Sequence, residues 1–262
     1  MIDKSIKFGV LNLLTFMGKL SAIGRCFYGI AIAAMGLLTM YFKDFPYMLI
    51  PPNHHWLNEH VIFLYLSGAL LILAGGCIVL SRMIVPISLV LGTVLLLIFC
   101  FYFIPYEVIV SANYKQLGDW ENAAKELALA GGAFVVAGRG SKRLFLFGTL
   151  VFSLTILIFG INHFVYAKEA AGYISSWIPY PLFWMYFCGL ALVGSAIGII
   201  LKIKPRLMAM LLGMMIFSWV IILHIPKSIA AGGSDMGGEI SSGFLALAYC
   251  GIAFVIAGEN QP

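Results

Sequence analysis

The sequence predicts an all-α membrane protein with eight transmembrane helices, arranged as two tandem four-helix bundles in parallel orientation and preceded by an N-terminal interfacial helix. Three observations predict this class: the composition, the number of apolar runs and an internal repeat. Of the 262 residues, 62% are apolar and only 10% are charged, whereas about a quarter of residues carry charge in soluble domains. The mean hydropathy is +1.01. Any chemistry of this chain is therefore expected in or at the membrane.

Apolar runs bounded by charged residues, proline or glycine define the eight predicted spans, each close to the roughly 20 residues that cross a bilayer. They cover residues 20–42, 59–80, 84–106, 120–138, 144–167, 181–201, 205–225 and 239–257. Residues 1–19 carry Lys4, Lys7 and Lys19 around apolar residues at helical spacing. This pattern is typical of an interfacial helix and not of a cleaved signal, so we expect this segment to lie on the membrane surface.

The basic residues are distributed unequally between the two sides of the predicted membrane domain. Eleven of the 16 Lys and Arg residues fall on the side of the chain termini. By the positive-inside rule, both termini are expected in the cytoplasm, as in a multi-pass protein of the bacterial cytoplasmic (inner) membrane. Because these charges are divided among loops and do not form one patch, the net charge of +5 does not indicate a nucleic-acid partner.

All five histidines fall on the opposite, outer half: His54, His55, His60, His163 and His224. Histidine titrates near neutral pH and binds metals, haem iron and quinone carbonyls. This distribution indicates the outer leaflet as the working face, although the first three also suit a hydrated loop. The five cysteines lie in apolar runs and form no CxxC pair, which disfavours a thiol-disulfide relay.

The second half of the chain repeats the first. Residues 131–138 (GGAFVVAG) and 251–258 (GIAFVIAG) agree at six of eight positions, and further glycines match at offsets of 120 to 124 residues. The predicted units are residues 20–140 and 141–262. Because each unit has four spans, an even number, the halves should share one orientation about an axis along the membrane normal.

Residues 120–132 read WENAAKELALAGG, and the third span ends in an aromatic-X-Ile-Pro segment at Tyr102–Pro105. These stretches resemble the fourth and third helices of DoxX-like membrane proteins, and the four-span pattern runs twice along nearly the whole chain. The resemblance implies a four-helix unit, here duplicated. It also implies kinship with the small membrane subunit of thiosulfate:quinone oxidoreductase and with partners in other membrane redox complexes.

The fourth predicted span carries a first group of candidate site residues. Glu121 and Lys125 are four residues apart, as are Asn122 and Glu126, so each pair can meet on a helix face. Lys125 and Glu126 should lie about 8 Å below Trp120, where a charge must be paired or hydrated. They are expected to line a polar outer cavity or to form a structural ion pair. The second half has Ser242, Leu245 and Ala246 at the positions of Asn122, Lys125 and Glu126.

A second group lies in the other half, where Asn162 and His163 end the fifth span and His224 ends the seventh at similar depth. The two histidines could hydrogen-bond a quinone head group, or ligate a metal or haem. No third ligand occurs at helical spacing, so no metal site is expected. The equivalent positions of the first half are Leu38, Thr39 and Phe103, none of which is ionisable.

Glu107 follows Ile104-Pro105-Tyr106 at the outer end of the third span. Proline should end or bend its helix and free backbone carbonyls there. This arrangement fits the mouth of a substrate or quinone pocket, and it fits a simple helix stop equally well.

These residues support three hypotheses. The first is a membrane subunit of an electron-transfer or quinone-linked system, with quinone as its ligand and another membrane or periplasmic protein as its partner. The second is a scaffold or assembly subunit without catalysis of its own, and the third is a small-solute or lipid carrier. The loops contain no phosphate-binding glycine loop, HExxH helix or GxSxG elbow, which argues against ATP-driven transport and classical hydrolysis. Whether the chain is an enzyme is left open.

Overall fold

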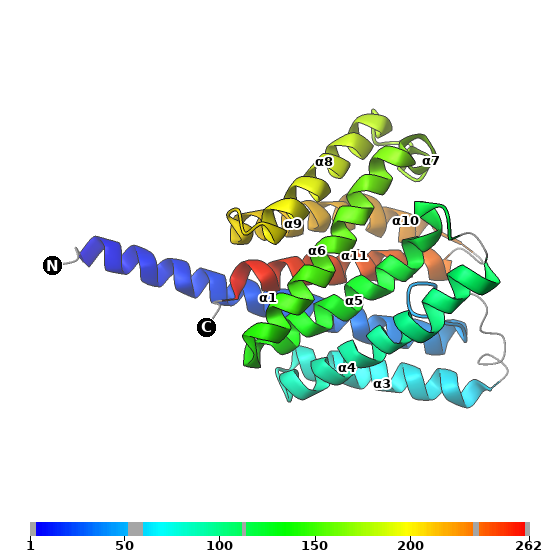
Figure 1. The fold of residues 1–262 in the computed structure, drawn as a ribbon, viewed down its shortest axis with the longest axis horizontal. Coiled ribbons are helices and arrows are strands. Elements are labelled where there is room, and N and C mark those ends of the chain that lie inside the picture. Colours follow the sequence, from blue (N-terminus) through cyan, green and yellow to red (C-terminus); the bar gives the residue numbers. More distant parts are fainter. Residues whose placement is uncertain (1–3, 52–59, 112–113, 233–235, 260–262) are drawn as a thin grey trace.

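The computed structural model describes residues 4–259, apart from 52–59, 112–113 and 233–235, and this part of the chain is helical and contains no strand (Figure 1). His54 and His55 lie outside the described residues. Within these described residues, seven helical segments are long and apolar enough to cross a membrane, which confirms the all-α membrane class. They are Thr15–Phe42, Val61–Val79, Ile84–Val110, Lys142–Val165, Pro181–Ile200, Pro205–Ala230 and Gly237–Gly258.

The first helix differs from its prediction. Helix α1 runs without interruption from Lys4 to Phe42, and its N-terminal part projects beyond the other helices (Figure 1). The segment predicted as an interfacial helix is thus continuous with the first spanning helix from Lys4 onward, and its location at the membrane surface stays a prediction. No proline lies between Lys4 and Lys19, so every residue of this stretch has the backbone N–H that continues a helix.

Two of the spanning segments continue through a proline. Helix α4 (Ile84–Ile98) is followed by the π-helical turns Phe99–Phe103 and Tyr106–Val110, with Pro105 between them. Helix α9 (Pro205–Trp219) is followed by the π-helical turn Val220–His224 and then by α10 (Ile225–Ala230), which contains Pro226. A π turn shifts the hydrogen-bond pattern by one residue, and this accommodates the missing proline N–H. The spans predicted to end at residues 106 and 225 therefore continue to Val110 and Ala230.

Helix α5 (Glu121–Ala137) occupies the fourth predicted span but is not one of the seven candidates. It has 17 residues, of which 13 are buried. The short 3-10 turns Leu117–Trp120 and Gly138–Gly140 lie at its two ends. The described residues thus give seven spans by length and composition, and α5 is a shorter helix enclosed by the others.

The helix pairing joins the two halves of the chain. Helix α1 packs along α3 (Val61–Val79) and α11 (Met236–Gly258), while α6 (Lys142–Val165) packs along α8 (Pro181–Ile200) and α5. The first helix of each half therefore lies beside the last helix of the other half. Helices α5 and α11 also contact each other at the centre (Figure 1).

Close approach at these pairs depends on glycine. A Cβ added to Gly24 on α1 would lie 2.5 Å from the carbonyl oxygen of Gly251 on α11, and a Cβ on Gly251 would lie 2.5 Å from that of Gly24. Gly148 on α6 and Gly131 on α5 face each other in the same way, since a Cβ on Gly148 would lie 2.5 Å from the Gly131 oxygen. Small residues allow such backbone contact where lipid provides no hydrophobic drive for helices to associate.

We expect Gly148→Ala and Gly251→Ala to destabilise the protein. The new methyl groups would collide with backbone atoms, which cannot move aside as a flexible side chain can, and overpacking of this kind costs about 1–3 kcal/mol. The matched control is Gly194→Ala, where nothing lies within 4 Å of the added Cβ. Melting of the detergent-solubilised variants, followed by size-exclusion chromatography, measures the difference. Equal melting temperatures for Gly148→Ala and Gly194→Ala would contradict the close contact.

Candidate functional site

A cavity of about 680 Å³ lies among α6, α8, α9 and α11, beside the N-terminal part of α5. We call the end of the bundle opposite the chain termini the distal end. On α6 the lining residues run from Ile156 to Tyr166, about 15 Å at 1.5 Å per residue, so the cavity occupies the distal part of the helices. Its volume lies within the roughly 300–1,000 Å³ of small-molecule sites. We call it the distal cavity.

The distal cavity brings together three of the residues that the sequence singles out. Lys125, His163 and His224 all line it, from α5, α6 and the π turn after α9. They are separated by up to 99 positions in the sequence, and only the packing of the second-half helices against α5 places them around one space. The short helix α7 (Ala167–Ala171) and the segment after it contribute Glu169, Ala170, Tyr173 and Ile174 to the same cavity.

Lys125 is held in place by its own helix and by α11. Its Nζ lies 2.6 Å from Glu121 Oε1, an ion pair across one helical turn, and it donates a hydrogen bond of 3.3 Å to Asn122 Oδ1. The hydroxyl of Tyr249 on α11 donates to the Lys125 carbonyl oxygen at 3.1 Å. The ammonium group therefore lies in the cavity wall with its charge balanced by a half-exposed carboxylate.

The hydrogen bonding of His163 defines which of its ring nitrogens is free. Nδ1 lies 2.7 Å from the Phe159 carbonyl oxygen. Because a carbonyl can only accept, Nδ1 must carry the proton in this contact. In the neutral ring Nε2 then presents a lone pair that can accept a hydrogen bond from a ligand in the distal cavity.

Asn162 and His224 have buried polar atoms without a protein partner. Neither Nδ2 nor Oδ1 of Asn162 has a hydrogen-bond partner among the described residues, and the same holds for Nδ1 of His224. Nearly all buried polar groups in proteins are hydrogen-bonded to protein or to ordered water. Since both residues line the distal cavity, their partners are expected to be molecules that occupy it.

Two tryptophans line the distal cavity where α8 and α9 meet. Trp184 and Trp219 pack edge to face with ring centroids 5.7 Å apart, and both line the cavity. Trp219 Nε1 donates to Cys188 Sγ at 3.0 Å and Trp184 Nε1 donates to the Pro179 carbonyl oxygen at 3.1 Å. Both indole N–H groups are thus satisfied, and the rings offer apolar faces to the interior.

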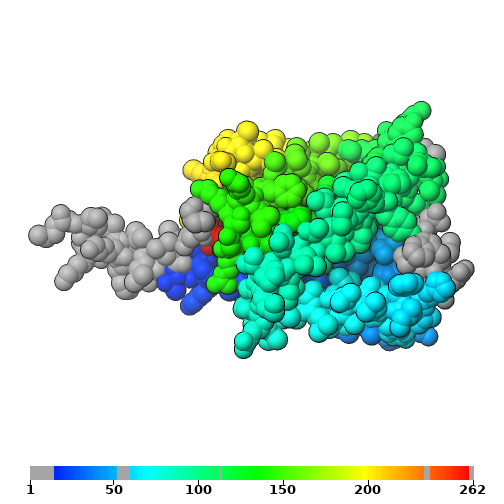
Figure 2. Space-filling model, turned by 60° about the horizontal axis from the view of Figure 1, so that its bottom comes forward, coloured from blue at the N-terminus to red at the C-terminus, as the bar shows by residue number. Residues whose placement is uncertain are grey.

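The first half has a different opening between its corresponding helices. A groove of about 610 Å³ runs between α3 and α4 on the face shown in Figure 2, with a lining that is apolar apart from Ser67 and Cys77. The repeat places Phe63 and Ile98 where Trp184 and Trp219 stand in the second half. Both of these residues line the groove, so there is no aromatic pair at this point, and none of the described residues that line the groove is a histidine or charged.

Two of the sequence-predicted residues lie away from the distal cavity, and one lies at its edge. Glu126 is fully buried and Glu107 is 5% exposed, and neither lines the cavity. Glu107 belongs to the π turn Tyr106–Val110. Asn122 reaches the site only through its bond to Lys125.

A cluster of three polar residues, Tyr173, Lys227 and Glu239, connects α10, α11 and the segment after α7 at the distal end. Lys227 on α10 lies 3.2 Å from Glu239 Oε1 on α11, sits 3.1 Å from the centroid of the Tyr173 ring and donates to the Tyr173 carbonyl oxygen. The Tyr173 hydroxyl donates to Glu239 Oε2 at 2.7 Å. Burial and this bond raise the pKa of the Tyr173 hydroxyl, so it remains a donor. The cluster holds the segment after α7 over the cavity.

Several lining residues could not be recognised in the sequence. Trp184 and Trp219 look like interfacial aromatic residues, and Tyr249 sits at the repeat position of Leu129, where nothing marks it as polar lining. Part of the lining could be recognised by comparing the two halves of the sequence. Asn162, His163 and His224 are polar, whereas the equivalent residues of the first half are not ionisable. Among the described residues, no group of three or more His, Cys, Asp or Glu side chains is arranged to hold a metal ion.

Comparison of the chain with protein-family models, with curated proteins and with solved structures finds no match. In the residues that the structure describes, the fold and the site define a helical protein with seven candidate membrane spans and a partly polar cavity at its distal end.

The polar cluster of Lys227 should contribute measurably to stability. In Lys227→Met the butyl stem is retained, but Glu239 loses its cation while four-fifths of its side chain is covered. We expect a loss of about 1–2 kcal/mol. The control is Lys168→Met at an exposed position of α7, which should change stability by less than about 0.5 kcal/mol. Thermal melting in detergent compares the two, and an unchanged Lys227→Met protein would show that the cluster is not stabilising.

Proposed function

We propose that the protein binds a quinone in the distal cavity and serves as a membrane subunit of a quinone-linked electron-transfer system. The observation that carries the proposal is the composition of this one cavity: Asn162 and His224 have unpartnered polar atoms, and the walls beside them are aromatic and aliphatic. A quinone combines a flat apolar ring with carbonyl groups at its edge. An amphiphile of this kind matches both parts of the lining.

The polar groups provide the hydrogen bonds that such a head group needs. Quinone carbonyl oxygens are acceptors, and the Lys125 ammonium and the Asn162 amide are donors in the cavity wall. The free Nε2 of His163 is an acceptor suited to the hydroxyl of the reduced, hydroquinone form. The site can therefore bind both redox states, with donors serving the quinone and an acceptor serving the hydroquinone.

The redox reaction that the proposal implies requires a second protein. Reduction of a quinone to a hydroquinone takes two electrons and two protons. We infer that a periplasmic or membrane partner delivers the electrons. The resemblance to DoxX-like subunits of membrane redox complexes supports this assignment. In this arrangement the present chain binds the quinone and the partner oxidises the substrate.

The finer topology belongs to the same proposal. We infer eight spans, with α5 as a short eighth span, and two parallel four-helix repeats with cytoplasmic termini in a bacterial inner membrane. The repeat-equivalent contacts support this inference, because Gly24 packs on Gly251 as Gly148 packs on Gly131. The distal cavity then opens in the outer leaflet.

Removal of the histidines should weaken quinone binding. We expect His163→Ala and His224→Ala each to raise the Kd about tenfold, since one hydrogen bond contributes about 1–1.5 kcal/mol. Quenching of tryptophan fluorescence by a short-chain ubiquinone or menaquinone analogue measures the affinity, because Trp184 and Trp219 line the cavity.

The matched control is His60→Ala, since His60 is exposed, precedes α3 and does not line the distal cavity. A second control is Trp219→Phe, which should reduce the quenching amplitude. Equal Kd values for His163→Ala, His224→Ala and the unmodified protein, together with no quinone in organic extracts of the purified protein, would overturn the proposal. Recovery of a stoichiometric protein partner without quinone would then favour the scaffold, and solute flux in proteoliposomes would favour the carrier.

A further inference from the structure

Glu126 lies in the interior of the protein in a way that the quinone site does not explain. Its side chain is fully buried, and both carboxyl oxygens lack a hydrogen-bond partner among the described residues. It is the only carboxyl group of the described part of the chain with both oxygens in this state. Each unsatisfied acceptor is unfavourable, so the group needs an occupant that the protein side chains do not supply.

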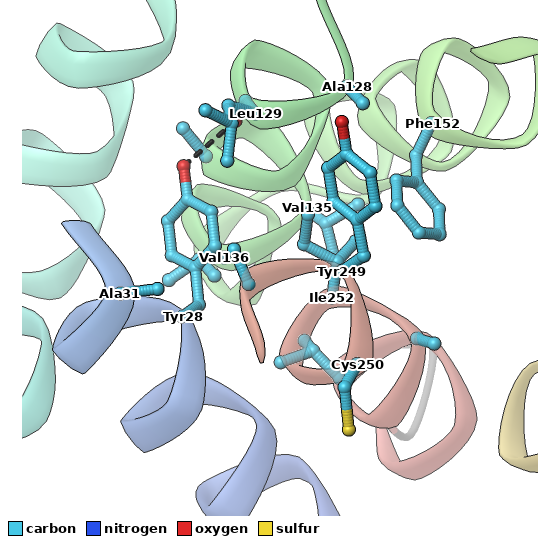
Figure 3. Close-up of a cluster of buried hydrophobic side chains, with 14 of the residues drawn as sticks. Tyr28, Ala31, Ala128, Leu129, Val135, Val136, Phe152, Tyr249, Cys250 and Ile252 are labelled. Carbon is cyan, nitrogen blue, oxygen red and sulfur yellow. Dashed lines mark hydrogen bonds between the residues drawn. The ribbon is translucent and has the colours of Figure 1, made fainter. Parts of the chain in front are cut away.

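Within the described part of the chain, no lysine, arginine or histidine forms an ion pair with Glu126. Its neighbour in sequence, Lys125, lies about 100° away around the helix and is bound to Glu121 and Asn122. The hydroxyls of Tyr28 on α1 and Tyr249 on α11 are buried groups that interact electrostatically with Glu126. Both hydroxyls already donate to α5 carbonyl oxygens: Tyr28 to that of Leu129 (Figure 3), and Tyr249 to that of Lys125.

Packing does not require a glutamate at this place. The repeat puts Ala246 of α11 at the equivalent position, and α11 makes the equivalent contact with α1 that α5 makes with α6. The other half thus builds the same type of helix pair with a methyl group. A carboxyl at residue 126 adds an unsatisfied polar group to the core and contributes no bond among the described residues in return.

We propose that Glu126 is a proton-binding site in the interior of the membrane domain, occupied by a proton in the resting protein. An isolated carboxylate at this place would be highly unfavourable, whereas the neutral acid removes the charge and gives the group an O–H donor. Ionisable residues inside membrane proteins commonly mark proton relays. Lys125 and Glu126 therefore have different roles on α5. The lysine faces the distal cavity, and the glutamic acid stores a proton in the core beside Tyr28.

The proposal can be tested with an apolar carbodiimide, dicyclohexylcarbodiimide, on the purified protein. The acid O–H adds across one C=N bond: its proton goes to nitrogen and the carboxyl oxygen bonds to the central carbon. The acyl group then migrates to nitrogen and gives a stable N-acylurea, with no atom lost and no change in oxidation state. We expect peptide mass spectrometry to find one reagent mass on Glu126, and no such adduct in Glu126→Gln.

Two variants make the labelling specific. Glu107→Gln removes the other buried carboxyl of the described chain and should leave the label on Glu126 unchanged. Glu121→Gln removes a half-exposed carboxylate, which should react with a water-soluble carbodiimide and not with the apolar one. Labelling of Glu121 in preference to Glu126 by the apolar reagent would count against a neutral acid in the core.

Infrared difference spectroscopy decides the protonation state directly. The spectrum of the unmodified protein minus that of Glu126→Gln should show the C=O band of a carboxylic acid, and the band should shift in D₂O as the proton exchanges. Carboxylate bands in place of the acid band would overturn the proposal, whether or not the carbodiimide reaches the side chain. If Glu126→Gln does not fold, Glu126→Asp retains the acid and provides the same comparison through a displaced band. Neither measurement involves quinone, so its failure and that of the quinone proposal are distinguishable.

Discussion

The position of α5 among α1, α4, α6 and α11 is the constraint on which the rest of the structure depends. In lipid there is no hydrophobic drive for helices to associate, so contact has to come from close packing of small residues and from satisfied backbone groups. The run of alanine and glycine along residues 128–133 of α5 is buried completely or nearly so. Two tyrosine hydroxyls donate to carbonyl oxygens one turn apart on this helix: Tyr28 of α1 to Leu129 (Figure 3), and Tyr249 of α11 to Lys125. Because helices of both halves converge on α5, the halves are interlocked.

This interlocking explains how one half can provide residues to the cavity of the other. Lys125 belongs to the first half by sequence, yet its ammonium group lies in a cavity whose remaining walls come almost wholly from the second half. The two halves differ in the polarity of their openings. The second half has a partly polar cavity lined by Trp184 and Trp219, while the first half has an apolar groove between α3 and α4. In the first half the buried residues Phe45, Leu49 and Ile50 after α1 fill the space beside this groove.

Much of the fold could be predicted from the sequence, because apolar run length and glycine spacing are local signals. The spans were placed within a few residues, apart from the two prolines and the start of α1. Proline lacks a backbone N–H and is therefore expected to end or bend a helix. A π turn allows the helix to continue through it, and no single residue in the sequence indicates that such a turn will form. The expected eighth span was harder to judge, since α5 is short and carries Glu121, Lys125 and Glu126. Its burial among other helices depends on tertiary contacts.

The residues of the candidate site could be predicted only in part from the sequence, because their positions depend on tertiary contacts. Asymmetry between the repeats identified His163 and His224, because a duplicated chain supplies its own reference sequence. The same comparison placed Lys125 and Glu126 together as one polar feature, since they are adjacent in sequence. In the helix they differ by about 100° in direction, and this difference places one at a cavity and the other in the core. Two charged residues that the second half replaces by Leu245 and Ala246 therefore need two separate explanations. A ligand-binding wall accounts for the lysine, and a stored proton accounts for the glutamate.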